Sequence, residues 1–112
     1  MKLPNGDRAI VDRRKLRDYC LNVAHPEGRH KARVFRSALG ITWDDADALA
    51  GLFLEMAASA EAIAGHADQF GSRHQIDALL RWRGKAAMVR TAWITRHGDS
   101  RPHLTSCYVL ID

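Results

Sequence analysis

Hydrophobic residues recur at helical spacing along the first half of the chain. The first stripe follows Asp12, a residue type that caps helix N-termini, and it consists of Leu16, Tyr19, Cys20 and Val23. We expect this helix to end between Asn22 and Ala24. A second helix is predicted to open at Pro26, which suits a first helical turn, and to stop at Gly40; its apolar face contains Ala32, Phe35, Ala38 and Leu39.

A third and longer apolar stripe occupies the middle of the chain. Thr42 and Asp45 resemble a capping box, with Asp in place of the usual Glu, and so mark the start of a helix. The stripe that follows contains Leu49, Leu52, Phe53, Met56, Ala60 and Ile63. We expect this helix to end at Gly65 and a polar loop to run from His66 to Ser72.

After this loop the apolar pattern changes from helical to alternating. Strands are predicted over residues 76–82, 87–94 and 104–111, with a turn at 83–85 and a loop at 98–102. The predicted fold class is α+β, with about three N-terminal helices packed on a C-terminal antiparallel sheet of three or four strands. Residues 7–11 or 69–72 are the alternatives for a fourth strand. A chain of 112 residues suits a single domain, spanning residues 1–112.

Charge is distributed unevenly along the sequence. Residues 1–40 carry ten Lys or Arg and four acids, residues 41–70 carry six acids and no Lys or Arg, and residues 71–112 carry seven basic residues and three acids. We therefore expect a polyanion to contact the first and last thirds, unless these charges are only solvated helix faces. No apolar run is long enough for a membrane span. Cys20 and Cys107 are expected to be buried thiols in a reducing cytoplasm.

The segment from His25 to Lys31 contains the most informative chemistry. If Pro26 opens the helix, His25 stands at a helix N-terminus, where free backbone N–H groups can bind phosphate and the dipole favours a neutral imidazole able to act as a base. Lys31 lies at the edge of the buried stripe, and Arg29 belongs to an outer basic ridge. The simpler alternative is that His25 only caps the helix and Lys31 only buries its aliphatic stem.

The predicted strands add further polar candidates. Strand alternation places Thr91 and Trp93 on one face and Arg90 on the other, and the last strand offers Thr105 and Tyr108. The other histidines lack zinc-ligand spacing, the acids lack a magnesium-nuclease arrangement, and there is neither a nucleotide loop nor a nucleophile motif. We therefore expect no metal and no other cofactor.

Several ordered blocks of the sequence resemble a known family. They are Leu3-Pro4-Asn5, Lys15-Leu16, Tyr19-Cys20-Leu21-Asn22, His25 to Ala32 with Phe35, Leu39-Gly40-Ile41, Val89 to Ile94 and Arg101 to Thr105. The chain resembles an uncharacterised bacterial domain family that occurs alone or at the C-terminus of phage-head morphogenesis and polymorphic-toxin proteins. That family is similar to the barnase–EndoU–colicin–RelE ribonuclease class, in which helices precede a four-stranded antiparallel sheet. His30 falls at a variable position of the family pattern.

The resemblance implies a metal-independent endoribonuclease-type toxin that cleaves RNA by attack of a ribose 2′-hydroxyl on the adjacent phosphate. The implied catalytic residues are His25 as base or acid, Lys31 as charge stabiliser, and Thr91 and Thr105 as phosphate-positioning donors. The implied RNA- or phosphate-binding residues are Gly28, Arg29, Arg90, Trp93 and Arg101. The expected partners are RNA and a small acidic antitoxin or immunity protein, in the cytoplasm. The alternative is a non-catalytic RNA-binding, antitoxin or immunity module, and the oligomeric state is left open.

Overall fold

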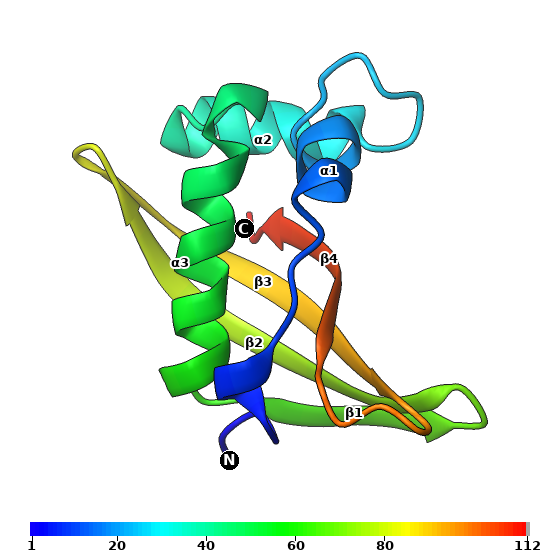
Figure 1. Cartoon of the computed structure of the whole chain (residues 1–112). Coiled ribbons are helices and arrows are strands. Elements are labelled where there is room, and N and C mark those ends of the chain that lie inside the picture. Colours follow the sequence, from blue (N-terminus) through cyan, green and yellow to red (C-terminus); the bar gives the residue numbers. More distant parts are fainter. Residues whose placement is uncertain (112) are drawn as a thin grey trace.

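The computed structural model describes residues 1–111 and places three α-helices before a four-stranded antiparallel sheet. Helices α1 (Arg13–Lys15), α2 (Arg29–Leu39) and α3 (Ala46–Ser59) cover one face of the sheet (Figure 1). The strands, in their order across the sheet, are β1 (Ile63–Asp68), β2 (Gly71–Trp82), β3 (Lys85–Arg96) and β4 (His103–Val109). The predicted α+β class is confirmed. No helix in residues 1–111 is long and apolar enough to cross a membrane.

The N-terminal segment leads into the first helical turns. It runs between α3 and β4, and Ile10 forms a parallel bridge with His103 (Figure 1). The Asp12 carboxylate then accepts a hydrogen bond from the backbone N–H of Lys15 (3.2 Å), which confirms it as the cap of α1. A π-helical turn over Leu16–Cys20 continues α1, so Val23 lies beyond the helix and is exposed rather than part of its apolar face.

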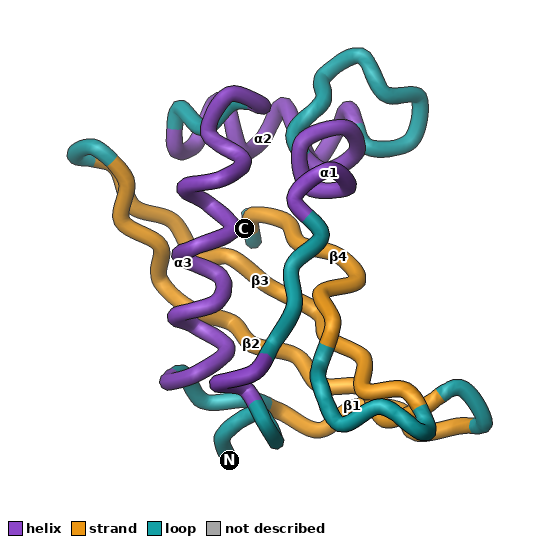
Figure 2. The backbone as a smooth tube through the Cα atoms, in the orientation of Figure 1, coloured by secondary structure: helices purple, strands orange, loops and turns teal. Residues whose placement is uncertain are grey.

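Helix α2 begins later than the sequence predicts. Pro26 lies in a turn within the long connecting loop, and the first helical residue is Arg29 (Figure 2). His25 caps this turn, because its Nδ1 accepts the backbone N–H groups of Glu27 and Gly28 and its carbonyl accepts that of Arg29, whereas the hydrogen bonds of α2 itself begin at the Gly28 carbonyl. The C-terminus agrees with the prediction, since Gly40 adopts a left-handed conformation (φ 72°).

Helix α3 begins as predicted but ends earlier. The Asp45 carboxylate accepts a hydrogen bond from the Thr42 backbone N–H (2.9 Å), which is half of the expected capping box. The helix stops at Ser59 because Ala60 is extended (ψ 157°), and the chain then enters β1. Ile63 and Gly65 were predicted to complete α3 and instead belong to β1, which also replaces most of the predicted loop.

The sheet is a meander built on the long β2–β3 hairpin. The two strands pair without interruption from Gly71↔Arg96 to Trp82↔Lys85. Arg83 and Gly84 both have positive φ (47° and 84°), as the tight turn of a two-residue hairpin requires. The pairing of β3 with β4 contains a bulge between Ala92 and Trp93. Between the sheet and the helices lies the core, which includes Phe35, Phe53, Leu16, Leu49, Ile76, Val89, Trp93 and the buried free thiols Cys20 and Cys107.

Candidate functional site

The predicted polar residues of β3 separate onto two faces of the sheet. Thr91 and Trp93 are 0% and 1% exposed on the covered face. The Trp93 indole N–H donates to the Thr91 hydroxyl oxygen (2.8 Å), and that hydroxyl donates to the Ile76 carbonyl (3.4 Å). Both side chains are fully enclosed and bonded to each other, so neither is accessible for the predicted phosphate contact or base stacking. We therefore assign them to the core.

Arg90, on the opposite face, joins a cluster across three strands. Its cross-strand neighbours are Asp77 on β2 and Tyr108 on β4. The guanidinium donates two hydrogen bonds to the Asp77 carboxylate (2.8 and 3.0 Å) and a third to the Tyr108 hydroxyl (3.3 Å). The Asp77 contact raises the pKa of Arg90 further above its ordinary value, and the same contact lowers the pKa of Asp77. Arg90 is thus a permanent, fixed cation.

Lys31 approaches the same phenol from the helical side. It is half-buried on α2, and its ammonium lies 5.1 Å from the centre of the Tyr108 ring, while the Arg90 guanidinium carbon lies 5.9 Å from it. Because β4 is an edge strand, Lys31 can reach this ring from the covered side. The structure therefore brings two of the predicted cations, Lys31 and Arg90, to one phenol. We call Lys31, Asp77, Arg90 and Tyr108 the Tyr108 cluster.

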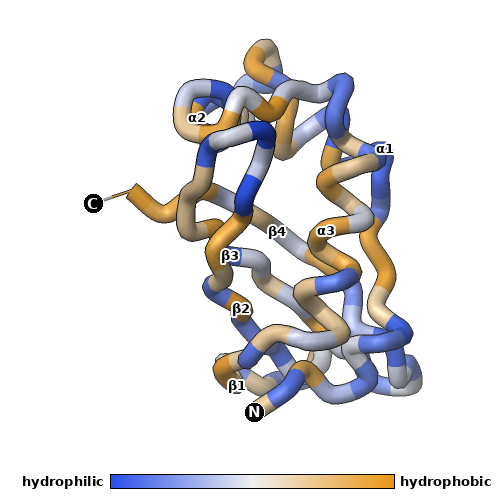
Figure 3. The backbone as a smooth tube through the Cα atoms, turned by 90° about the vertical axis from the view of Figure 1, so that its left-hand side faces the viewer, coloured by the Kyte–Doolittle hydropathy of each residue, from blue (hydrophilic) through white to orange (hydrophobic). Residues whose placement is uncertain are grey.

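A cavity of about 300 Å³ opens beside this cluster. Its polar walls are His30, Lys31 and Tyr108, and its apolar walls are Val34, Val109, Leu110 and Ile111. The apolar end of the chain, with Ile111 72% exposed, projects from the body at this side (Figure 3). The histidine that lines the cavity with Lys31 is thus His30 and not the predicted His25.

His25 instead organises the turn before α2. Its Nδ1 accepts hydrogen bonds from the backbone N–H groups of Glu27 and Gly28 (both 3.0 Å), and its ring packs edge-on against Tyr19 (4.5 Å between centroids). The N–H groups predicted to bind phosphate are therefore taken by the imidazole. An Nδ1 that accepts must carry its lone pair, so the neutral ring has its proton on Nε2. In that tautomer Nε2–H can donate a hydrogen bond, and Nδ1 can take up a proton only if it releases the two backbone N–H groups.

The remaining predicted residues have local structural contacts. A Cβ at Gly28 would lie 2.1 Å from the Tyr19 carbonyl oxygen, so close packing explains this glycine. The Thr105 hydroxyl donates to the Ala92 carbonyl (3.1 Å), and Lys15 donates to the Thr105 carbonyl (3.1 Å). Two further predicted cations lie apart from the cluster: Arg101 donates to the Arg8 carbonyl before β4 begins, and Arg29 is exposed at the start of α2.

Comparisons with known proteins place this arrangement in a family. The family described as "Domain of unknown function (DUF6883)" matches residues 2–111. The chain belongs to this family. No curated protein sequence matches it. Among solved structures, the fold is similar to that of a chain in a contact-dependent growth inhibition toxin–immunity protein complex from Klebsiella pneumoniae 342, with a TM-score of 0.71, 15% identity, and coverage of 96% of this chain and 98% of that one. At this identity, the likeness shows a shared fold.

Two residues of the Tyr108 cluster, Asp77 and Tyr108, were not among the site residues predicted from the sequence. Asp77 was noted only as a polar residue between apolar ones, and Tyr108 only as a polar residue in the last strand. Cross-strand register unites both with Arg90, and register cannot be read from a single sequence. The sequence did offer one signal for this cluster, because Tyr108 and Arg90 lie on strands that were predicted to follow one another along the chain.

Proposed function

We propose that this chain is a metal-independent endoribonuclease-type toxin domain that acts on RNA in the cytoplasm. The observation that carries the proposal is the convergence of Lys31 and Arg90 on the Tyr108 ring beside an open cavity. The hydrogen-bonded Arg90 guanidinium, the Lys31 ammonium and a phenol provide the charge and the donors that a phosphodiester requires. The family assignment and the fold shared with a chain of a toxin–immunity protein complex support a toxin-related role.

The proposed reaction needs no metal ion. A base removes the proton of a ribose 2′-hydroxyl, and the oxygen attacks the adjacent phosphorus. The bond from phosphorus to the 5′-oxygen then breaks, and an acid protonates that oxygen. The products are a 2′,3′-cyclic phosphate end and a 5′-hydroxyl end. Negative charge accumulates on the phosphorane oxygens in between, and this charge is what the cations must stabilise.

Three residues of the cavity, and Arg90 beside it, take the following roles in the proposal. Lys31 and Arg90 stabilise the phosphorane, and Tyr108 donates its hydroxyl proton to a phosphate oxygen, because its oxygen already accepts from Arg90. His30 lines the cavity with Lys31 and serves as base in this chain. His25 is retained only as acid, in its imidazolium form, in which Nε2–H protonates the leaving 5′-oxygen and Nδ1 gives up its two backbone hydrogen bonds. Because position 30 varies in the family pattern, the His30 role is specific to this sequence.

The decisive experiment incubates the purified chain with total RNA in EDTA and maps the cut ends. We expect cleavage with cyclic phosphate ends, and we expect Lys31→Ala to abolish both the cleavage and the growth arrest caused by expression in bacteria. Lys85→Ala is the matched control, since Lys85 is an exposed lysine at the start of β3 that lines neither this cavity nor the other two described for the chain. Intact RNA over a range of ionic strength, or equal cleavage by Lys31→Ala, would refute the proposal.

The part played by His25 needs a separate pair of variants. His25→Ala removes the acceptor that holds the turn before α2, so lost activity alone would not show catalysis. His25→Asn provides a side-chain oxygen for the same backbone N–H groups but no acidic proton. If His25 is the acid, both variants are inactive although His25→Asn melts near the temperature of the wild type. If its role is only to cap the turn, His25→Asn cleaves RNA normally.

A non-catalytic module is the second candidate, because the similar solved structure contains an immunity protein as well as a toxin. On this alternative the chain binds RNA, a toxin or an acidic partner without cleaving anything. Co-expression with each small protein encoded beside it separates the two cases. A toxin is neutralised by such a neighbour, whereas an immunity-type module itself neutralises the neighbour and arrests no growth alone.

A further inference from the structure

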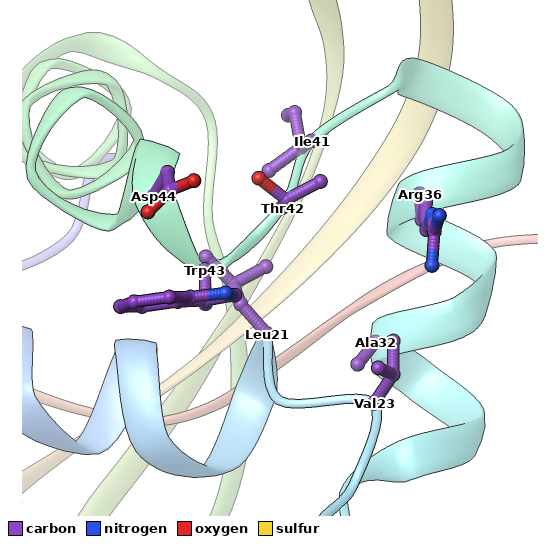
Figure 4. Close-up of a pocket in the computed structure, with 8 residues that line it drawn as sticks. All are labelled: Leu21, Val23, Ala32, Arg36, Ile41, Thr42, Trp43 and Asp44. Atoms are coloured by element: carbon purple, nitrogen blue, oxygen red, sulfur yellow. The ribbon is translucent and has the colours of Figure 1, made fainter.

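Trp43 presents an indole to solvent at the entrance to α3. Its residue is 55% exposed, and it lines two cavities, of about 240 and 360 Å³. The smaller cavity lies between the 41–44 segment, α2 and the end of the first helical turns (Figure 4). Its apolar walls are Leu21, Val23, Ala32 and Ile41, and its polar walls are Arg36, Thr42 and Asp44. An aromatic ring therefore stands at the boundary of a half-polar hollow.

The larger cavity brings a second group of cations to the same indole. Its walls are Arg13, Arg14, Arg17, Trp43, Asp44, Ala46 and Asp47. Arg13 is 3.6 Å from Asp47, and Arg17 is 3.0 Å from Asp18, so these two charges are partly compensated. Within residues 1–111, neither Arg14 nor Arg36 forms an ion pair. Each cavity thus keeps an uncompensated guanidinium.

Helix α2 extends this basic surface along its outer side. Arg29, Arg33 and Arg36 are exposed and follow one another at i, i+4 and i+7, which places them on one helix face. That face borders the Trp43 cavities through Arg36, whereas Lys31 lines the cavity of the Tyr108 cluster. The Trp43 surface is therefore a second region, distinct from the proposed catalytic cavity.

We propose that Trp43 is a stacking platform for an unpaired nucleobase of RNA, with the flanking phosphates bound by arginines on either side. This inference rests on the proposed function. It adds that the RNA substrate contains an unpaired segment, one base of which stacks on Trp43. A base has a flat face for the indole, and its polar edge can meet the Thr42 hydroxyl and the Asp44 carboxylate. A base within a duplex is covered on both faces and cannot stack in this way.

Charge favours RNA over a protein as the occupant. Four arginines line the two cavities that the indole borders, namely Arg13, Arg14, Arg17 and Arg36, against two acids, Asp44 and Asp47. Exposed aromatic rings between cations that follow a backbone are the usual design of single-strand binding surfaces. An acidic protein that used the same surface would appear as a separate outcome of the test.

The test measures binding without cleavage. The wild-type chain is titrated into a fluorescein-labelled, single-stranded oligonucleotide of about ten 2′-O-methyl nucleotides, which lacks the attacking hydroxyl and spans the site sizes common for such surfaces. We expect Trp43→Ala to weaken binding about 5- to 100-fold and Trp43→Phe to restore most of it. Arg36→Ala should reduce the slope of log affinity against log salt by about 0.7. Trp82→Phe, at a half-buried tryptophan with its own arginine 4.9 Å away, should change nothing.

The outcomes separate this inference from the proposed function. Equal affinity of wild type and Trp43→Ala overturns the stacking platform, even if RNA cleavage stands. Weakened binding by Trp43→Ala without any cleavage of ordinary RNA supports the platform and refutes the nuclease. A Trp43→Ala chain that binds RNA normally but loses an acidic neighbouring protein shows a protein interface instead, which also overturns the inference. No binding by the wild type refutes it directly.

Discussion

Strand β3 carries polar side chains on both of its faces, and their surroundings differ. Thr91 and Trp93 lie on the covered face, and Arg90 lies on the open face. On the covered face, the hydroxyl of Thr91 links the Trp93 indole to a main-chain carbonyl within the core. On the open face, Arg90 joins Asp77 and Tyr108. These side chains are partly solvated, and the phenolic proton of Tyr108 donates to no acceptor within residues 1–111.

The difference shows how the two roles of polar residues can be distinguished. A buried polar group whose partners are all internal secures one packing arrangement, because any rearrangement leaves a donor unpaired. In the half-exposed cluster, the Tyr108 hydroxyl still has a proton to donate, and Arg90 is already paired with Asp77. Such a cluster can bind an anion such as phosphate without breaking its own hydrogen bonds. Substitutions on the covered face should therefore change stability first, and those on the open face should change activity first.

The largest effect is expected at Trp93. Replacing it with Ala removes a fully buried indole and leaves a cavity, which should cost about 3–5 kcal/mol of the free energy of unfolding. Urea titration followed by circular dichroism measures this loss. A loss below about 1 kcal/mol would show that the covered face is less tightly packed than the structure indicates.

Arg90→Ala should have its main effect on catalysis. If the chain cleaves RNA as proposed, loss of this cation should lower the cleavage rate by about 100- to 1000-fold, while the free energy of unfolding should fall by only about 1 kcal/mol because the ion pair with Asp77 is partly exposed. Single-turnover cleavage and urea titration of the same preparation test both halves. A stability loss equal to that of Trp93→Ala would erase the distinction between the faces.

Thr91→Val keeps the shape of the side chain but removes its hydroxyl. The buried Trp93 indole N–H then has no acceptor, which should cost about 1–3 kcal/mol. Thr91→Ser is the matched control, because it preserves the acceptor and should lose less. If instead Thr91→Ser folds stably and Thr91→Val also retains wild-type stability while losing cleavage, then Thr91 has the catalytic role that its burial argues against.

The smallest expected effect is a pH dependence at Asp77. The hydrogen bond from Arg90 lowers the pKa of this carboxyl in the folded state, so its contribution to stability is present above the unfolded value of about 3.9 and is lost as the pH falls through the folded value. Wild type should therefore exceed Asp77→Asn in stability at pH 7 by at most about 1 kcal/mol. The gap should close as the pH falls below the lowered folded-state pKa of Asp77. A gap that is independent of pH would contradict the ion pair.

The sequence predicted the elements whose side chains alternate between a buried and an exposed environment. β3 is the clearest case, because Val89, Thr91 and Trp93 face the core. β1 has no such contrast, since its residues are exposed or half-exposed, with Ile63 63% exposed, and its apolar residues continue the period of α3 by coincidence. The start of α2 was misplaced for another reason, because Pro26 does lie in a turn capped by His25, but the continuous helix begins only at Arg29, and residue types alone do not separate a single turn from the first turn of a helix.

The candidate site was predictable only in part. Lys31 was placed at a cleft edge from its position beside the apolar stripe of α2, and the cavity beside it agrees with that expectation. Lys31 contacts the Tyr108 ring because β4 forms the edge of the sheet. The tautomer of His25 is set by the backbone N–H groups of the turn that follows it. Neither follows from residue spacing.

The contact of Ile10 with residues 102–104 also constrains how the molecule is made. The Ile10 N–H donates to the Pro102 carbonyl (2.9 Å), and Leu104 donates back to Ile10 (3.0 Å), so the N-terminal segment is anchored by residues synthesised some ninety positions later. On a ribosome that segment has to wait until residues 102–104 have been synthesised, and contacts of such long sequence separation slow folding. The cavity beside Tyr108 uses residues 108–111, which are synthesised later still, so it cannot form before them.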